Sequence, residues 1–147
     1  MDQPDSQTHG FLFADLREYT RFVEARGDLA AAALLGEYRE LVRGVVGRSR
    51  GAEIRTEGDS FYVVFPSASL AVQCGLAILA AVGQRNATAT DAIRVGIGVH
   101  AGETASTPDG LVGSAVNIAA RVCGQARAGE LLVTDTVRSL TDRKSVV

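Results

Sequence analysis

The sequence predicts an α+β domain from three patterns. Apolar residues alternate with other residues over 93–100, which is typical of a half-buried strand. Two short apolar runs flank the turn Glu57-Gly58-Asp59, which predicts a β-hairpin. Apolar residues recur at helical spacing from Leu34 to Val46, which predicts a long helix with one buried face. We therefore expect helices packed against a mostly antiparallel sheet.

The other elements follow from the same local patterns, and no internal repeat is visible. Residues 1–9 are expected to form a polar leader, and residues 10–147 a single domain. Asp28 is a favourable helix N-cap, and Gly51 is a favourable residue to end that helix. The expected elements are strand 10–15, helix 20–26, a helix between Asp28 and Gly51, strands 52–56 and 60–65, helix 68–82, a loop at 86–91, strand 93–100, a loop at 102–110, helix 114–127, strand 130–134 and a helix from 135.

Composition excludes several classes of protein. The chain has 147 residues, 46% of them hydrophobic, and a net charge of −2. This length and composition suit one globular domain with a sizeable core. No broad basic field is present, so we expect no nucleic-acid partner. The longest apolar runs, residues 29–35 and 76–82, are too short to cross a bilayer, so we expect no membrane span.

The N-terminus and the cysteines indicate a cytoplasmic protein. Residues 1–9 are polar and lack the apolar core of a signal peptide. Cys74 and Cys123 lie in small-residue apolar stretches and form no CxxC pair. We therefore expect buried free thiols in a reducing compartment rather than a disulfide or a zinc site.

Asp15 and Asp59 are the best candidates for metal binding. Asp15 ends an apolar strand, and Asp59 lies in the turn of the next hairpin. If these strands are neighbours, about 4.8 Å apart, both carboxylates can reach one ion. Mg²⁺ is held in this way, by one or two carboxylates with waters and substrate phosphate oxygens. The alternative is that Asp15 caps the following turn and that Asp59 is an ordinary turn residue.

Asn117 and Arg121 are four residues apart on a predicted helix, so they project from one face. Their neighbours are apolar or small, which indicates that this part of the helix packs closely against something. An amide and a guanidinium there could hold a ribose and neutralise charge on a phosphoryl group. On spacing alone, a solvated face or a helix salt bridge is the better interpretation.

Two other places could contact a ligand. Tyr19 and Thr20 follow Asp15 where the chain turns into a helix, and free N–H groups there could receive a phosphate. The alternative is that Thr20 is an ordinary helix N-cap. Arg55 and Glu57 precede Asp59 in the hairpin, and as an isolated pair they would form a solvated turn.

Four segments together resemble the catalytic domain of the class III nucleotide cyclases, the adenylate and guanylate cyclases. They are FADLREYTRF (13–22), IRTEGDSFYVVF (54–65), RVGIGVHAGE (94–103) and GSAVNIAARV (113–122). The segments occur in the family's order and at its spacing, from about residue 10 to the end. The resemblance, which is to the bacterial type, implies a ferredoxin-like sandwich.

The resemblance also implies roles for single residues. Asp15 and Asp59 match the two metal-binding aspartates, and the carbonyl of Leu16 matches a further metal contact. Asn117 matches the residue that orients the ribose, and Arg121 the one that stabilises the pentavalent phosphorus. Two Mg²⁺ or Mn²⁺ ions per site and a head-to-tail homodimer with its sites at the interface are implied as well. The metal ligands and the Asn–Arg pair of one site then come from opposite chains.

The chain departs from the family's pattern in three places. Arg55 stands where adenylate cyclases carry a base-reading Lys and guanylate cyclases a Glu. Gly110 stands at the second base-reading position, with Asp109 beside it. The family continues with two further strands and a phosphate-binding Lys, so we expect the C-terminal strands to be missing after Val147.

The implied activity is cyclisation of a purine nucleoside triphosphate, ATP rather than GTP on family frequency, to the 3′,5′-cyclic monophosphate and pyrophosphate. A non-catalytic cyclase-like module, which binds a nucleotide or signals by dimerising, remains an alternative because Arg55 and Gly110 depart from the pattern. A sheet domain that polymerises nucleotides would share the two carboxylates. No feature of the sequence favours that third interpretation over the cyclase.

Overall fold

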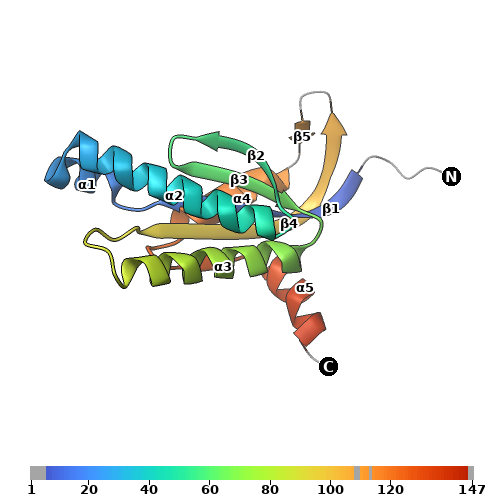
Figure 1. Ribbon diagram of the computed structural model, residues 1–147. Helices are drawn as coiled ribbons and strands as arrows, with labels where there is room; N and C mark the ends of the chain where they lie inside the picture. The colour runs from blue at the N-terminus through green and yellow to red at the C-terminus, as the bar shows by residue number, and fades with distance from the viewer. Residues whose placement is uncertain (1–5, 108–109, 113, 146–147) are drawn as a thin grey trace.

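A six-stranded sheet organises the fold of the computed structural model, which describes residues 6–107, 110–112 and 114–145. Helices lie on both sides of this sheet (Figure 1). The elements in chain order are β1 (Ser6–Leu16), α1 (Tyr19–Arg26), α2 (Asp28–Arg48), β2 (Ala52–Glu57), β3 (Ser60–Phe65), α3 (Ala68–Asn86), β4 (Val95–Thr107), β5 (Gly110–Val112), α4 (Ser114–Gln125), β6 (Leu131–Val133) and α5 (Asp135–Ser145).

β1 lies in the middle of the sheet. The strand order is β2-β3-β1-β4-β5, and β6 pairs with β4 outside this path. The β2–β3, β3–β1, β1–β4 and β4–β5 pairs are antiparallel, and the β4–β6 pair is parallel. The predicted α+β class with a mostly antiparallel sheet is therefore confirmed.

The alternation of side chains along β1 explains why both faces of the sheet are covered. Leu12 and Ala14 belong to the larger core, which α2 and α3 share with one face. Phe11 and Phe13 point to the other face and pack in a second cluster with Ala119 of α4. Successive strand residues point to opposite faces, so an unbroken apolar run is what a central strand between two helical layers requires.

β4 differs most from its sequence prediction. It runs over Val95–Thr107 instead of 93–100, and the loop expected at 102–110 is wrong because residues 102–107 continue the strand. On one side this stretch pairs with β1, where Ala105 lies opposite Ser6. On the other side it pairs with β5, where Thr107 lies opposite Gly110. Small and polar residues have weak strand propensity, but backbone pairing on both sides outweighs it here. β1 likewise begins at Ser6, within the stretch expected as a leader.

Asp28 is not the N-cap of α2, as the sequence had predicted. Gly27 takes that position with a φ of 87°, and it also ends α1. A positive φ favours glycine, so one glycine can join two helices directly. Asp28 is instead the first residue of α2, where a carboxylate opposes the positive end of the helix dipole.

α3 begins as predicted and ends later, at Asn86 rather than at residue 82. Its N-cap is Ser67, whose hydroxyl accepts a hydrogen bond of 3.2 Å from the Leu70 amide. Among the described residues, α3 is the one helix with the length and apolar composition to cross a bilayer. Its buried residues pack in the core against the sheet, and Leu76 on its outer side is 55% exposed.

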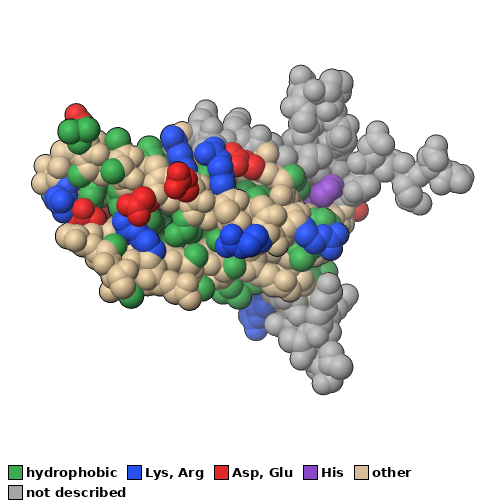
Figure 2. All heavy atoms as spheres, viewed as in Figure 1, with side chains coloured by type: hydrophobic (Ala, Val, Ile, Leu, Met, Phe, Trp, Pro, Cys, Tyr) green, Lys and Arg blue, Asp and Glu red, His purple; other side chains and the backbone are tan. Residues whose placement is uncertain are grey.

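Both cysteines are free and buried, as predicted. Burial raises the pKa of the Cys123 thiol to about 11, so it stays protonated at neutral pH. The face of the molecule seen in Figure 2 carries Arg side chains interspersed with Asp and Glu, and no field of one sign covers it. Ion pairs such as Arg85–Glu37, at 3.1 Å, account for part of this mixture.

The close approach of α4 to β4 depends on Gly98. A Cβ at this position would lie 2.2 Å from the backbone nitrogen of Cys123. We expect Gly98→Ala to push α4 from the sheet and to lower the free energy of unfolding by about 1–3 kcal/mol, the usual cost of overpacking. Urea unfolding followed by circular dichroism measures this loss. Gly36→Ala is the matched control, because a Cβ there meets nothing within 4 Å; an equal loss in both variants would contradict the packing argument.

Candidate active site

The structure brings Asp15 and Asp59 together at one end of the sheet. Asp15 lies near the end of β1, and Asp59 lies in the turn between β2 and β3. The β1–β3 register, with Ala14 opposite Phe61, places the end of β1 beside this turn. The hydroxyl of Ser60 donates a hydrogen bond of 2.5 Å to Asp15 Oδ1. Strand pairing thus brings the two carboxylates together and meets the condition that a shared ion would require.

The two carboxylates interact electrostatically. Burial and the nearby charge of Asp59 raise the pKa of Asp15, while the hydrogen bond from Ser60 and the charge of Arg17 partly offset this rise. The Asp15 side chain is still 34% exposed, so a ligand can reach it. Like charges held close together without full compensation are what a cation site requires.

A cavity of about 450 Å³ opens beside Asp59, and Leu16, the neighbour of Asp15 in sequence, also lines it. This volume is within the range of small-molecule sites, about 300–1,000 Å³. Its lining includes four positions that sequence reasoning had singled out. The lining residues are Leu16, Glu18, Tyr19, Thr20, Leu35, Gly58 and Asp59.

The start of α1 forms one wall of this cavity. Glu18 is the N-cap with a φ of 62°, and its side chain makes no capping hydrogen bond. The alternative of a Thr20 N-cap is therefore wrong, because Thr20 is the second residue of the helix. The Tyr19 hydroxyl donates to the carbonyl of Ala31 at 3.1 Å, which ties α1 to α2. The backbone at the helix start, rather than the Tyr19 hydroxyl, is thus the group available to an anion.

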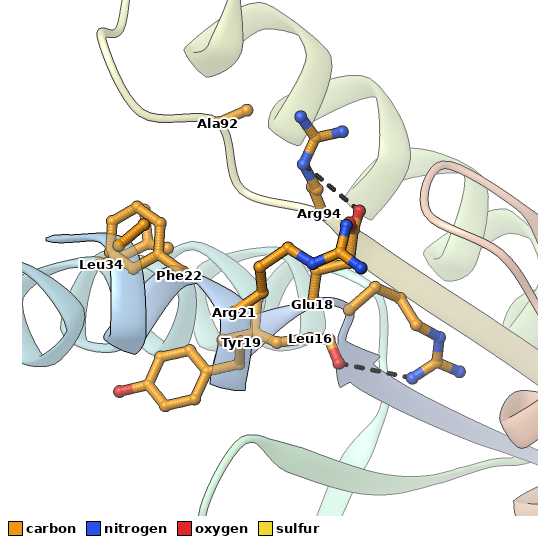
Figure 3. A pocket seen from close by; sticks show the side chains of 10 residues that line it. Leu16, Glu18, Tyr19, Arg21, Phe22, Leu34, Ala92 and Arg94 are labelled. Carbon is orange, nitrogen blue, oxygen red and sulfur yellow. Dashed lines mark hydrogen bonds and ion pairs between the residues drawn. The ribbon is translucent and has the colours of Figure 1, made fainter.

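Glu18 also lines a second cavity of about 320 Å³ on α1. Its carboxylate lies 3.2 Å from Arg21 Nη1 and 3.6 Å from Arg94 Nε. Figure 3 shows Arg21 and Arg94 on either side of Glu18, with Leu16 and Tyr19 nearby. The charge of Glu18 is compensated by these two arginines. Asp15 and Asp59 are therefore the carboxylates that we assign to the acidic pair of the site.

Sequence reasoning missed three residues that support the acidic pair. Ser60 bonds Asp15 directly, and its place beside Asp59 in the hairpin could have indicated this. Arg39 of α2 donates through Nε to the carbonyl of Gly58 at 3.1 Å, which fixes the turn that carries Asp59. Arg17 lies 4.0 Å from Asp15. The contact of Arg39 spans 19 residues and has no local sequence signal.

Tyr38 lies beneath the site in the core. It is fully buried and packs edge-on against Phe61, with 5.6 Å between the ring centroids. Its hydroxyl has no hydrogen-bond partner within the part of the chain that the structure describes. Burial and then the charges of Asp15 and Asp59 raise its pKa well above the usual range, so it stays a protonated donor near the acidic pair.

The donor set fits a hard divalent cation. No group of three or more His, Cys, Asp or Glu side chains that could hold a metal occurs among the described residues. An ion at Asp15 and Asp59 would therefore complete its shell with backbone carbonyls, water or oxygens of a ligand. Oxygen donors of this kind suit Mg²⁺ or Mn²⁺, whereas zinc sites use His and Cys.

The other predicted site residues lie on different elements. Asn117 and Arg121 are exposed on α4, and neither lines the cavity beside Asp59. Arg55 lies in β2 opposite Tyr62, and Gly110 begins β5 opposite Thr107. The order of the sheet places β3, β1 and β4 between β2 and β5. Asp109 lies outside the described residues.

The fold and the site together define an α+β sandwich that carries a candidate divalent-cation site at a strand end and an adjacent hairpin turn. The sequence model of the adenylate and guanylate cyclase catalytic domain matches residues 1–147. The chain therefore belongs to the family of adenylate and guanylate cyclase catalytic domains.

Similar proteins agree with this membership. The chain is 32% identical over 130 residues to a pH-sensitive adenylate cyclase of Mycobacterium tuberculosis, covering 86% of the chain and 30% of that protein. It is 28% identical over 134 residues to the serine/threonine-protein kinase pkn2 of Myxococcus xanthus, covering 90% of the chain and 16% of the kinase. The chain thus spans less than a third of these relatives. An adenylate/guanylate cyclase/hydrolase from Silicibacter pomeroyi is 29% identical and superposes with a TM-score of 0.78, covering 95% of this chain and 82% of that one.

Proposed function

We propose that this domain converts a purine nucleoside triphosphate, ATP in preference to GTP, to its 3′,5′-cyclic monophosphate and pyrophosphate. The observation that carries the proposal is the meeting of Asp15 and Asp59, with a cavity of small-molecule size beside Asp59, in a chain of the cyclase family. We propose that the domain acts in signal transduction in the cytoplasm. We propose neither a nucleic-acid partner nor a membrane-spanning helix for it.

Asp15, Asp59 and the carbonyl of Leu16 would hold two Mg²⁺ or Mn²⁺ ions. When bound, the ions supply Lewis acidity for the attack of the ribose 3′-hydroxyl on the α-phosphate and for the departure of pyrophosphate. Backbone N–H groups at Tyr19 and Thr20 bind phosphate oxygens at the start of α1. The hydrogen bond from Ser60 and the charge of Arg17 favour the ionised form of Asp15 and partly offset the rise in its pKa that burial and Asp59 cause.

We further propose a head-to-tail homodimer in which each site takes its second half from the partner. Asn117 and Arg121 are exposed on α4 and do not line the cavity of their own chain, which supports an arrangement in which the α4 of another copy completes it. The amide of Asn117 then orients the ribose. The Arg121 guanidinium neutralises charge that develops on the phosphoryl group in the transition state.

A second candidate is a non-catalytic module that binds a nucleotide and signals by dimerising. Arg55 and Gly110 favour this non-catalytic module, because both residues depart from the family's base-reading pattern. The retained Asp15, Asp59, Asn117 and Arg121 favour the enzyme.

Incubation of the domain with Mn²⁺ and each nucleoside triphosphate in turn separates the two candidates. Mass spectrometry should identify a 3′,5′-cyclic purine nucleotide, and excess chelator should stop its formation. Nucleotide binding without any product would support the non-catalytic module and contradict the enzyme.

Base selectivity provides a second test. Arg55 offers donors only and keeps its charge, so it can bond an acceptor on either purine, and Gly110 has no side chain to bias that choice. We expect wild-type kcat/KM values for ATP and GTP within about tenfold, a difference of about 1.4 kcal/mol. Arg55→Lys with Gly110→Asp should sharpen the preference for ATP. A strong wild-type preference for one purine would contradict this account and would assign base reading to other groups.

A further inference from the structure

Arg17 connects the end of β1 to the end of α4. Its Nε donates to the carbonyl of Ala126 at 2.7 Å, and its Nη2 donates to the carbonyl of Cys123. On the other side, its Nη1 lies 3.4 Å from the carbonyl of Leu16 and 4.0 Å from Asp15 Oδ2. One guanidinium therefore contacts the last turn of the helix that carries Arg121 and two groups of the proposed metal site.

The residues around Arg17 leave space for its guanidinium and hold α4 close to it. Its side chain is 20% exposed. A Cβ on Gly96 would lie 2.8 Å from Arg17 Nε and 2.9 Å from the carbonyl of Ala126, so glycine leaves the room that the guanidinium fills. The thiol of Cys123 donates to the carbonyl of Gly96 at 3.5 Å, which holds α4 against β4 at the same place.

Both carbonyls lie at the C-terminal end of α4. Cys123 is in its last turn, where its carbonyl also accepts from the Ala126 amide at 3.0 Å, and Ala126 directly follows the helix. A cation at this end is favoured by the helix dipole. A planar guanidinium can bond two carbonyls at fixed angles, which a lysine ammonium cannot reproduce. Arg17 therefore fixes the orientation of α4 as well as its position.

We propose that Arg17 is a positioning residue that joins the two catalytic halves carried by one chain. This inference rests on the proposed function. In the head-to-tail dimer, Asp15 and Leu16 of a chain serve one cleft, while its α4 serves the other. Arg17 consequently sets metal affinity in the first cleft and the placement of Arg121 in the second, and it links the two clefts through one chain.

Mixed dimers separate these two effects. A chain with Asp59→Ala and a chain with Arg121→Ala together form one cleft without either lesion. In that cleft the metal ligands come from the Arg121→Ala chain, and α4 comes from the Asp59→Ala chain. Arg17→Lys can then be added to either chain, so that it acts on one half of the working cleft at a time.

On the metal-donating chain, Arg17→Lys should raise the Mn²⁺ concentration for half-maximal activity about tenfold and leave kcat at saturating Mn²⁺ nearly unchanged. On the chain that donates α4, it should lower kcat about tenfold and leave the Mn²⁺ requirement unchanged. Tenfold is the lower end of the loss seen when a group that orients metal ligands is removed. A residue that merely supports folding would lower the active fraction equally in both placements.

Direct Mn²⁺ binding gives a readout that does not need turnover. Electron paramagnetic resonance of free Mn²⁺ should show affinity about tenfold weaker for the Arg17→Lys homodimer than for wild type. Arg21→Lys is the matched control, because the Arg21 side chain is 82% exposed and pairs with Glu18; this variant should bind Mn²⁺ like wild type. Arg17→Gln, which keeps one donor, serves as a second variant if the lysine variant does not fold.

The outcomes distinguish this inference from the proposed function. No turnover in the mixture without Arg17 substitutions would contradict the proposed function, and the Mn²⁺ titration would still test the link between Arg17 and the metal site. Turnover with the same kinetic change in both placements, or wild-type Mn²⁺ affinity in Arg17→Lys and Arg17→Gln, would overturn the positioning role.

Discussion

Replacing Asp15 or Asp59 by Asn is expected to lower kcat by about 10²–10⁴-fold, because a metal ion that stabilises transition-state charge contributes several kcal/mol. Asn keeps the size of the side chain and an oxygen, so the strand and the turn should keep their conformation. Initial rates at saturating Mn²⁺ and nucleotide measure the loss. Asp28→Asn, at an exposed position in the first turn of α2, is the matched control and should keep wild-type activity.

The same substitution at Asp15 should stabilise the metal-free fold. Burial and the charge of Asp59 raise the pKa of Asp15, so the folded state favours its protonated form, and this contribution is lost as the pH rises through the raised pKa. At neutral pH, Asp15→Asn should therefore raise the Tm of the metal-free protein. The gain should shrink as the pH falls toward the ordinary Asp value of about 3.9.

Added Mn²⁺ should raise the Tm of wild type by mass action and leave that of Asp15→Asn nearly unchanged. An Asn variant that is less stable than wild type at neutral pH would contradict the crowding of the two carboxylates. Cyclic nucleotide formation that survives in both Asn variants, or in excess chelator, would rule out this metal site.

Much of the fold was predictable because its central elements carry strong local patterns. The apolar run of β1 and the hairpin around Gly58 were each predicted from the sequence. The pairing of β1 with β3, which the sequence left as a condition, brings Asp15 beside Asp59. The tail of β4 was missed because its small and polar residues have weak strand signals and depend on pairing to both sides.

The supporting groups of the site were not predictable, because they act on backbone atoms far away in the sequence. Arg17 bonds a carbonyl 109 residues later, and Arg39 bonds one 19 residues later. Any surface arginine could make such a contact, so residue type and spacing contain no signal for it. The roles of Gly96 and Gly98 were equally unpredictable, because these glycines matter by leaving space for Arg17 and for α4.

Mixing two inactive chains is expected to restore activity if the sites are shared. An Asp59→Ala homodimer lacks a metal ligand in both clefts, and an Arg121→Ala homodimer lacks the guanidinium in both. In a head-to-tail mixed dimer both lesions fall in the same cleft, and the other cleft is wild type throughout. Random association makes about half of the dimers mixed, each with one of two sites intact, so activity should reach about a quarter of wild type.

The rate of cyclic nucleotide formation after equimolar mixing of these two chains is the most direct test of the account. The chains carry different affinity tags, so that a pull-down establishes the fraction of mixed dimers in the same sample. We expect each chain alone to be nearly inactive and the mixture to recover about a quarter of wild-type activity. No recovery in a sample shown to contain mixed dimers would contradict a catalytic site shared between two copies of this chain.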